Sequence, residues 1–156
     1  MNIFHFTLYW SVHLISFIKS RNIKKEFHST KIMSLRRKEI LVVDDSETNL
    51  LLLQAVLEDA GYHVVSIDNS SKAVEYIKKN KPDLILLDLL MPELDGFEFM
   101  ERLNDDSGAF PSPVIVVTAY SNQENDRKAK ELGAVDVVNK PINISSFIMK
   151  VNKIVN

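Results

Sequence analysis

The chain has 156 residues, of which 46% are apolar and 26% charged, a composition that suits one soluble globular domain. It contains no cysteine, which excludes disulfides and thiolate metal sites. The net charge of −2 hides an asymmetry: residues 1–38 carry eight Lys or Arg and one acid, whereas residues 39–156 carry eleven and twenty. An acidic globular part argues against nucleic-acid binding, because phosphate contacts need a basic face.

Residues 1–38 differ in character from the remainder of the chain. Their apolar and aromatic stretch, 3–18, would span about 24 Å as a helix, short of the roughly 30 Å of a hydrocarbon core. No positively charged segment precedes it, so we do not expect a secretory signal. We interpret 1–38 as an N-terminal extension that is either disordered or a start-site artefact, with translation beginning at Met33. We favour this over a membrane anchor or an interfacial helix, and expect a cytoplasmic protein.

From residue 39 onward, short apolar runs alternate with amphipathic stretches of helical length, a pattern typical of buried strands joined by helices. In chain order we predict a strand at Glu39–Val43, a helix at Glu47–Ala60, a strand at His63–Ile67, a helix near Ser71–Lys79, a strand at Asp83–Leu87, a helix at about Phe97–Leu103, a strand at Val114–Val117, a helix from Ser121 to Leu132, a strand at Val135–Val138 and a final helix.

Residues with strong end preferences mark several of these helices. Ser46 and Asn143 are predicted N-caps, Gly61 is a predicted stop, and Ser121 with Glu124 forms a predicted capping box. Five successive strand–helix units imply an α/β fold, a doubly wound parallel sheet with helices on both faces. The common strand order for five such strands is 2-1-3-4-5, and we adopt it.

Polar residues follow the carboxyl ends of four of these strands. Asp44 and Asp45 follow the first, Asp88 the third and Thr118 the fourth, and Lys140 comes shortly after the fifth. In an open α/β sheet, the residues just past the carboxyl ends of the strands gather in one crevice. We therefore expect three carboxylates, a hydroxyl and an ammonium to share one small volume.

This set of residues suits metal-assisted phosphoryl chemistry. The adjacent carboxylates of Asp44 and Asp45 repel each other, a divalent cation relieves that repulsion, and an all-oxygen site suits Mg²⁺. A lone acid pair is more simply a solvated turn, but Asp88 at a neighbouring strand end favours the metal site. A carboxylate can also act as a nucleophile toward a phosphoryl group, and Lys140 and Mg²⁺ would supply the positive charge that the transfer needs.

The segment 39–156 resembles the receiver domain of bacterial two-component response regulators, in its single-domain, chemotaxis-regulator-like form. Four motifs carry the resemblance, in order and at family-like spacing: ILVVDD at 40–45, DLILLDLLMPELDG at 83–96, VIVVTA at 114–119 and VVNKP at 137–141. The resemblance implies a flavodoxin-like receiver fold. It also implies a signalling phosphoacceptor that catalyses only its own phosphorylation and dephosphorylation, and is not otherwise an enzyme.

The resemblance implies phosphate-handling roles for three residues. Asp88 would be the phosphoacceptor and would receive its phosphoryl group from a histidine kinase or a histidine phosphotransfer protein. Thr118 would be the switch hydroxyl and Lys140 the cation that pairs with the phosphate, and Pro141 would follow a cis peptide bond. The family often has an aromatic residue on the fifth strand near this lysine. This chain has two valines at 137–138, so a switch based on an aromatic rotamer is in doubt.

The resemblance also implies a set of Mg²⁺ ligands. Asp45, Asp88 and the backbone carbonyl of Leu90 would bind the ion directly, and Asp44 would act largely through water. Leu90 is apolar where the family commonly has a polar side chain. Our hypothesis is that Leu90 hinders a hydrolytic water and so lengthens the life of the phosphorylated state.

We expect phosphorylation to change partner binding on the face formed by the helix at 121–132, the strand at 135–138 and the final helix. The chain ends near the end of that last helix, so we expect the downstream effector to be another protein, acting in trans. No nucleic-acid or membrane partner is expected.

Three other functions were weighed. The chain could be a phosphorelay intermediate that passes its phosphate to a histidine of another protein, and the sequence does not separate this from a terminal switch. A Mg²⁺-dependent phosphatase of the haloacid-dehalogenase type would need a second Asp two residues after the nucleophile, where this chain has Leu90. A histidine kinase is excluded because the receiver region has no Gly-rich ATP-binding segment, and its only histidine, His63, lies in a predicted strand.

Overall fold

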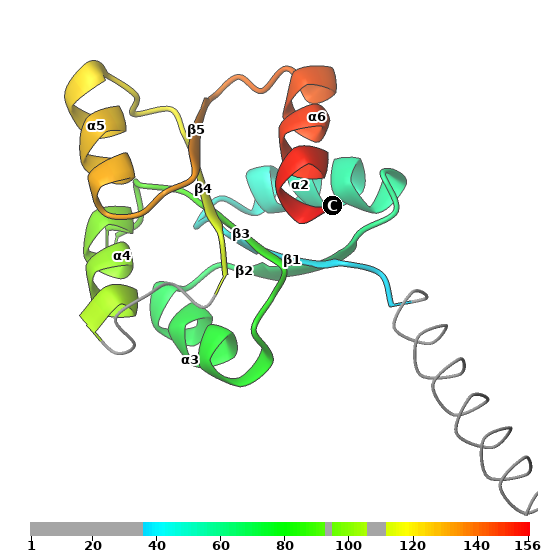
Figure 1. The fold of residues 1–156 in the computed structure, drawn as a ribbon, viewed down its shortest axis with the longest axis horizontal. Helices are drawn as coiled ribbons and strands as arrows, with labels where there is room; N and C mark the ends of the chain where they lie inside the picture. Colours follow the sequence, from blue (N-terminus) through cyan, green and yellow to red (C-terminus); the bar gives the residue numbers. More distant parts are fainter. Residues whose placement is uncertain (1–35, 93–94, 106–111) are drawn as a thin grey trace, which may run out of the picture. The chain divides into compact units, whose positions relative to one another are not determined.

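The computed structural model describes three stretches of the chain, residues 36–92, 95–105 and 112–156 (Figure 1). The chain separates into two units, Met1–Arg36 and Arg37–Asn156, and every element described below belongs to the second. The interpretation of the N-terminal extension therefore lies, except for its last three residues, outside the described part. Within the described residues, no helix is long and apolar enough to cross a membrane.

Five strands and five helices alternate through the described part of this unit. In chain order they are β1 (Glu39–Val43), α2 (Glu47–Asp59), β2 (His63–Ile67), α3 (Ser70–Asn80), β3 (Leu84–Leu87), α4 (Gly96–Asp105), β4 (Val114–Thr118), α5 (Gln123–Glu131), β5 (Asp136–Asn139) and α6 (Ile144–Val155). Each predicted strand and helix is present, with its ends within two residues of the prediction.

The strands form one sheet in the order β2-β1-β3-β4-β5, and every neighbouring pair is parallel. This confirms the predicted order and the α/β class. The register sets the ends of the central strands level, because Val43 of β1 pairs with Leu87 of β3. The next residue of each strand, Asp44 or Asp88, therefore emerges at the same edge of the sheet.

Side chains alternate between the two faces of the sheet, and each face is covered by its own helices (Figure 1). Ile40 and Val42 of β1 pack with residues of α2 and α6, whereas Leu41 and Val43 pack with residues of α3, α4 and α5. Both faces are buried, which is why the strands are continuous apolar runs and do not alternate apolar with polar residues. The sheet below its carboxyl edge is therefore packed between two hydrophobic cores, one on each face.

Three of the predicted helix ends are confirmed by their hydrogen bonds and backbone angles. The Ser46 and Asn143 side chains accept hydrogen bonds from backbone N–H groups in the first turns of α2 and α6. Gly61, after α2, has a φ of +93°, a left-handed conformation that glycine adopts without the steric cost of a Cβ atom. Ser46 also begins α2 directly after the acid pair, so the cap and the candidate site are adjacent.

The predicted capping box at Ser121 and Glu124 is wrong. Asn122 is the N-cap of α5, and its side chain accepts a hydrogen bond from the Asn125 N–H at 2.8 Å. The Asn125 amide in turn donates to the Tyr120 carbonyl at 3.0 Å, and these two bonds place the N-cap one residue later than predicted. Ser121 instead donates from its hydroxyl to the Asp126 carboxylate at 2.7 Å.

Candidate functional site

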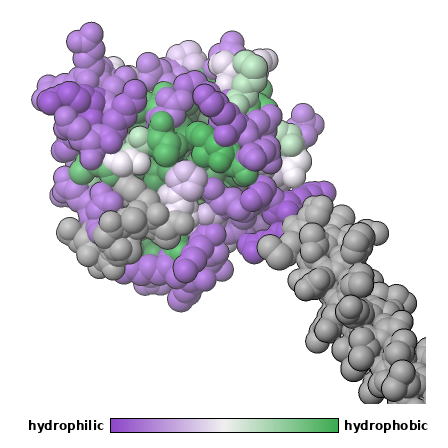
Figure 2. Space-filling model, in the orientation of Figure 1, coloured by the Kyte–Doolittle hydropathy of each residue, from purple (hydrophilic) through white to green (hydrophobic). Residues whose placement is uncertain are grey.

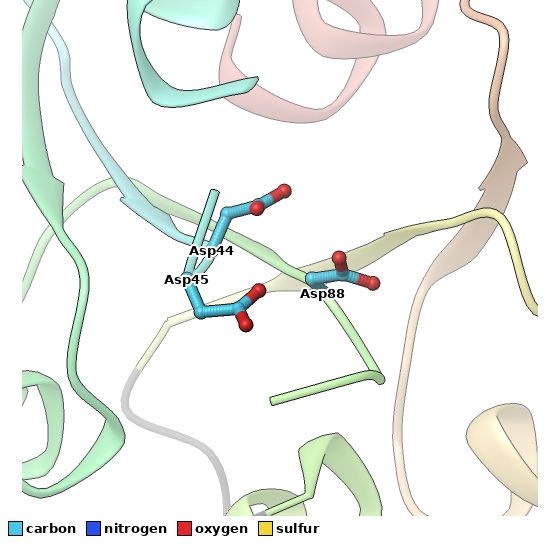
Figure 3. A group of neighbouring side chains, drawn as sticks. All are labelled: Asp44, Asp45 and Asp88. Atoms are coloured by element: carbon cyan, nitrogen blue, oxygen red, sulfur yellow. The ribbon is translucent and has the colours of Figure 1, made fainter. Parts of the chain in front are cut away.

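Three carboxylates lie together at the carboxyl edge of the sheet (Figure 3). Asp44 and Asp45 follow β1 and Asp88 follows β3, and each offers an oxygen within 4.8 Å of the others. Asp44 and Asp88 are buried, with 2% and 7% of their surface exposed, whereas Asp45 is exposed. The cluster therefore has two carboxylates held inside the protein and one that faces solvent, as expected for a site that opens on one side.

Lys140, which follows the edge strand β5, places a positive charge beside this cluster. Its ammonium lies 2.6 Å from an Asp44 oxygen and 2.8 Å from an Asp88 oxygen. Burial alone would lower the pKa of Lys140, but the hydrogen bonds to Asp44 and Asp88 and the charges of both carboxylates raise it above its usual value. The two buried carboxylates therefore favour the charged form of the lysine.

The backbone around Lys140 explains how it reaches the acids. Asn139, the last residue of β5, pairs with Thr118 of β4, and the Lys140 N–H donates to the Thr118 carbonyl at 2.9 Å. The bond between Lys140 and Pro141 is cis, as the resemblance implied. The chain therefore stays in register with β4 until the position from which the lysine side chain extends over the edge of the sheet.

Thr118 is fully buried at the end of β4. Its hydroxyl oxygen accepts a hydrogen bond from the Tyr120 N–H at 3.0 Å. Among the contacts of the described residues, the Thr118 hydroxyl makes no hydrogen bond to the three carboxylates or to Lys140. The structure thus brings the acids and the lysine into direct contact, and sets the threonine at the neighbouring strand end with its hydroxyl bonded to the loop that leads to α5.

The turn after Asp88 is held closely against that residue. The Leu90 N–H donates to an Asp88 carboxylate oxygen at 3.3 Å, and the Leu90 side chain is exposed. Gly96, at the start of α4, donates from its N–H to the Leu89 carbonyl at 2.9 Å. A Cβ atom on Gly96 would lie 2.6 Å from the Asp88 carbonyl oxygen, so only glycine fits this approach.

Asn49 is a site residue that the sequence prediction missed. It lies in the first turn of α2, and its side-chain amide donates to both oxygens of the Asp44 carboxylate at 3.1 Å. An asparagine in a first helical turn is ordinary, and its contact with the acid depends on the angle at which α2 leaves β1. The sequence therefore carried no signal for it.

The donor set fits a hard divalent cation. Three carboxylates face one ammonium, so the cluster keeps an excess of negative charge, and each candidate ligand atom is an oxygen. Such a site suits Mg²⁺, which prefers one or two carboxylates and several waters. All three carboxylates, of which Asp45 is the exposed one, lie close enough together to hold such an ion.

The comparisons with known proteins agree with this geometry. A family profile described as the response regulator receiver domain matches residues 40–152. The chain therefore belongs to the response regulator receiver domain family, and is a receiver domain of two-component signalling. This confirms the resemblance carried by the four motifs and the predicted flavodoxin-like receiver fold.

Individual relatives cover the same region of the chain. The chain is 32% identical over 111 residues to the polar-differentiation response regulator DivK of Brucella anthropi, an alignment that covers 71% of this chain and 90% of DivK. It is 36% identical over 115 residues to protein PilH of Pseudomonas aeruginosa, covering 74% of this chain and 95% of PilH. The structure of chemotaxis protein CheY4 from Vibrio cholerae matches with a TM-score of 0.70 and 27% identity, covering 76% of this chain and 99% of that one.

Proposed function

We propose that this receiver accepts a phosphoryl group on Asp88, in a Mg²⁺-dependent reaction, from a phosphohistidine of a histidine kinase or a phosphotransfer protein. An Asp88 oxygen attacks phosphorus, the phosphorus–nitrogen bond of the donor breaks, and the bonding electrons leave with the donor's histidine. The proposal is carried by one observation, the Lys140 ammonium placed between buried Asp44 and Asp88 beside exposed Asp45. The chain in this role catalyses only its own phosphorylation and dephosphorylation.

Each residue of the site has a definite task in this reaction. Asp45, Asp88 and the Leu90 carbonyl would hold Mg²⁺, with Asp44 acting largely through water, and the ion would supply positive charge against the negative phosphoryl oxygens. Lys140 already lies 2.8 Å from Asp88 and pairs with the phosphoryl group formed there.

The proposed switch begins at Thr118. Its hydroxyl accepts from the Tyr120 N–H and keeps a proton with which it donates to a phosphoryl oxygen. Hydrogen bonds to a charged group are worth about 1.5–3 kcal/mol each. Two of them, from Thr118 and Lys140, approach the roughly 5.5 kcal/mol that moves a two-state equilibrium from 1:99 to 99:1. Tyr120 transmits the shift, because its carbonyl accepts from Asn125 in the first turn of α5.

The surface that changes on phosphorylation is the one formed by α5, β5 and α6. Figure 2 shows hydrophobic surface, in green, where β5 runs between α5 and α6 in Figure 1. Large apolar side chains are exposed on and near these elements, namely Tyr120, Val135, Ile144 and Met149. We expect a downstream protein to bind there. Backbone NMR shifts on phosphorylation should be larger in α5, β5 and α6 than in α2 and α3, and changes confined to the acid cluster would contradict the switch.

The decisive experiment is intact-protein mass spectrometry after incubation with a small-molecule phosphodonor and Mg²⁺. We expect one added phosphoryl group, absent without Mg²⁺ and absent in Asp88→Asn. Asp59→Asn is the matched control, because Asp59 is an exposed aspartate at the end of α2, and it should be phosphorylated like the parent. A phosphoryl group that persists in Asp88→Asn would reject Asp88 as the acceptor.

A relay role remains the second candidate, and one observation favours it. Leu51 and Leu52 of α2 are 62% and 50% exposed, on the helix that begins directly after the acid pair. A phosphotransfer protein that contacts this apolar surface would bring its histidine close to the site. Transfer of the phosphoryl group from the purified phosphorylated chain to a histidine phosphotransfer protein would establish a relay; its failure with all such proteins of the source cell would leave the terminal switch.

The exposed Leu90 side chain bears on the lifetime of the phosphorylated state. We expect Leu90→Asn to shorten the half-life of the phosphorylated protein, because an amide orients a water that the apolar side chain excludes. The half-life is measured by the loss of the phosphorylated mass after donor removal. An unchanged half-life contradicts the hypothesis.

A further inference from the structure

Asn49 makes an unusual contact for an asparagine in a helix. It is half-buried in the first turn of α2, and one side-chain nitrogen lies 3.1 Å from each oxygen of Asp44. Its backbone N–H is already taken up by the Ser46 cap. The side chain is therefore not needed to cap the helix, and it spans the Asp44 carboxylate instead.

The hydrogen bonds to Asp44 account for most of its acceptor capacity. One oxygen accepts from the Ser46 N–H at 2.9 Å and the other from the Lys140 ammonium at 2.6 Å, and the two oxygens share the Asn49 amide nitrogen. An ionised carboxylate has about four acceptor sites. Three donors from the protein itself thus hold Asp44.

Asp88 differs from Asp44 in this respect. Its two oxygens accept one hydrogen bond each among those described, from the Leu90 N–H at 3.3 Å and from Lys140 at 2.8 Å. About half of its acceptor capacity is left for other ligands. Asp45, the third carboxylate, faces solvent. The protein's own hydrogen bonds therefore divide the three acids into one that is held by three protein donors and two that are more open to an ion.

We propose that Asn49 is a positioning residue, which holds the Asp44 carboxylate in contact with Lys140. Asp44 is thereby kept from binding the metal directly, and Asp45 and Asp88 are left to hold Mg²⁺. This inference rests on the proposed function. The Asn49 amide fixes the plane of the Asp44 carboxylate, and Asp44 in turn fixes the Lys140 ammonium against Asp88. Asn49 thus acts on the phosphoacceptor through two intermediates and touches neither the phosphoryl group nor the ion.

Loss of the amide has an effect that separates this role from a merely structural one. Without it, buried Asp44 loses the donor that spans both of its oxygens, so the carboxylate can turn toward Mg²⁺ and Lys140 loses a fixed partner. We expect Asn49→Leu to slow phosphorylation at saturating Mg²⁺ by about tenfold or more, while Mg²⁺ binds no more weakly than to the parent. A change that only loosened the fold would slow phosphorylation and also lower the Mg²⁺ affinity.

The test compares Asn49→Leu with Gln54→Leu in the full chain. Gln54 is a matched control because it is also a half-buried amide on α2, bonded to Glu58 and Ser66 away from the acids. Mg²⁺ affinity is measured by calorimetry with MgCl₂ alone, and the phosphorylation rate by mass spectrometry. A third readout is the NMR signal of the Lys140 ammonium, assigned by its loss in Lys140→Arg, which should be protected from exchange in the parent.

The expected result for Asn49→Leu is slow phosphorylation and loss of the ammonium signal. Gln54→Leu should keep the parent's phosphorylation rate and its ammonium signal. Phosphorylation at the parent rate, or a rate restored by raising Mg²⁺, would overturn the proposal, as would an unchanged ammonium signal. If the leucine variant does not fold, Asn49→Ser, whose side chain is too short to span both Asp44 oxygens, is held to the same outcomes. Calorimetry and the ammonium signal test the proposal even if the parent takes no phosphoryl group.

Discussion

The two ends of the sheet carry the same kinds of side chain and use them differently. At the amino end, Glu39 begins β1, and its buried carboxylate accepts a hydrogen bond from the Tyr76 hydroxyl at 2.9 Å. Asp83, just before β3, accepts from the Glu39 N–H at 2.9 Å and pairs with the Lys38 ammonium at 3.1 Å. Each of these carboxylates has a close donor, and the contacts join β1 to its neighbours.

At the carboxyl end, three carboxylates lie together, one ammonium pairs with two of them, and negative charge is left in excess. The difference teaches that an acid at a strand end is not by itself a functional signal. What distinguishes the site is a charge imbalance that the fold holds in place, because only a cation from outside can neutralise it. Three comparisons between the two ends, and one measurement at the amino end alone, test this distinction.

The largest effect is expected from removing the lysine at each end. Lys140→Met leaves two buried carboxylates without their cation and should lower the free energy of unfolding by about 3–5 kcal/mol. Lys38→Met removes a partly exposed pair and should cost no more than about 1 kcal/mol. Urea unfolding without Mg²⁺ measures both. Equal losses would mean that the two ends are electrostatically alike.

A glycine at each end gives the next comparison. Gly96→Ala places a Cβ atom against the Asp88 carbonyl and should cost roughly 1–3 kcal/mol of stability and also slow phosphorylation, because the phosphoacceptor moves. Gly61→Ala meets no atom, and its positive φ should cost about 1–2 kcal/mol of stability alone. Thermal unfolding and the phosphorylation rate separate the two. A slowed rate in Gly61→Ala would show that stability, not position, limits the reaction.

Neutralising one acid at each end should have opposite consequences. Asp45→Asn removes a like charge and a proposed ligand, so Mg²⁺ affinity should fall by about 10–100-fold while the metal-free protein becomes no less stable. Asp83→Asn should lower stability and leave Mg²⁺ affinity unchanged, because it breaks the Lys38 pair far from the metal. Calorimetry and urea unfolding measure these quantities. Undiminished affinity in Asp45→Asn would remove Asp45 from the ligands.

The smallest effect concerns the amino end of β5. Partial burial would raise the pKa of Asp136, but hydrogen bonds from the Lys150 ammonium and the Val137 N–H, and the charges of Lys150 and Lys130, outweigh it and hold that pKa below its usual value. A depressed pKa adds stability above the unfolded value of about 3.9, and the stability is lost as pH falls through the folded value. Asp136→Asn should cost about 0.2–1 kcal/mol at pH 7. Urea unfolding should show this difference shrinking as the pH falls below about 4, and a difference that grows would contradict the assigned sign.

Local patterns in the sequence were enough to predict the strands, the helices and the acids at the strand ends. A buried parallel strand must be apolar on both faces, so a run such as residues 40–43 can be recognised as a strand from the local sequence alone. Once the strands are known, parallel pairing places their carboxyl ends at one edge, and Asp44, Asp45 and Asp88 meet there. The strand order was predicted because few arrangements of five strand–helix units are common.

Only the tertiary structure decided which side chains touch. Lys140 is separated from Asp44 by 96 positions and from Asp88 by 52, and its reach depends on the register of β5 against β4. The contact of Asn49 with Asp44 depends on the direction in which α2 leaves the sheet. The start of α5 at Asn122 depends on a competition between side chains of similar capping strength. Periodicity records which residues are buried, whereas the pairing of polar groups across the fold is set by backbone geometry that no short segment contains.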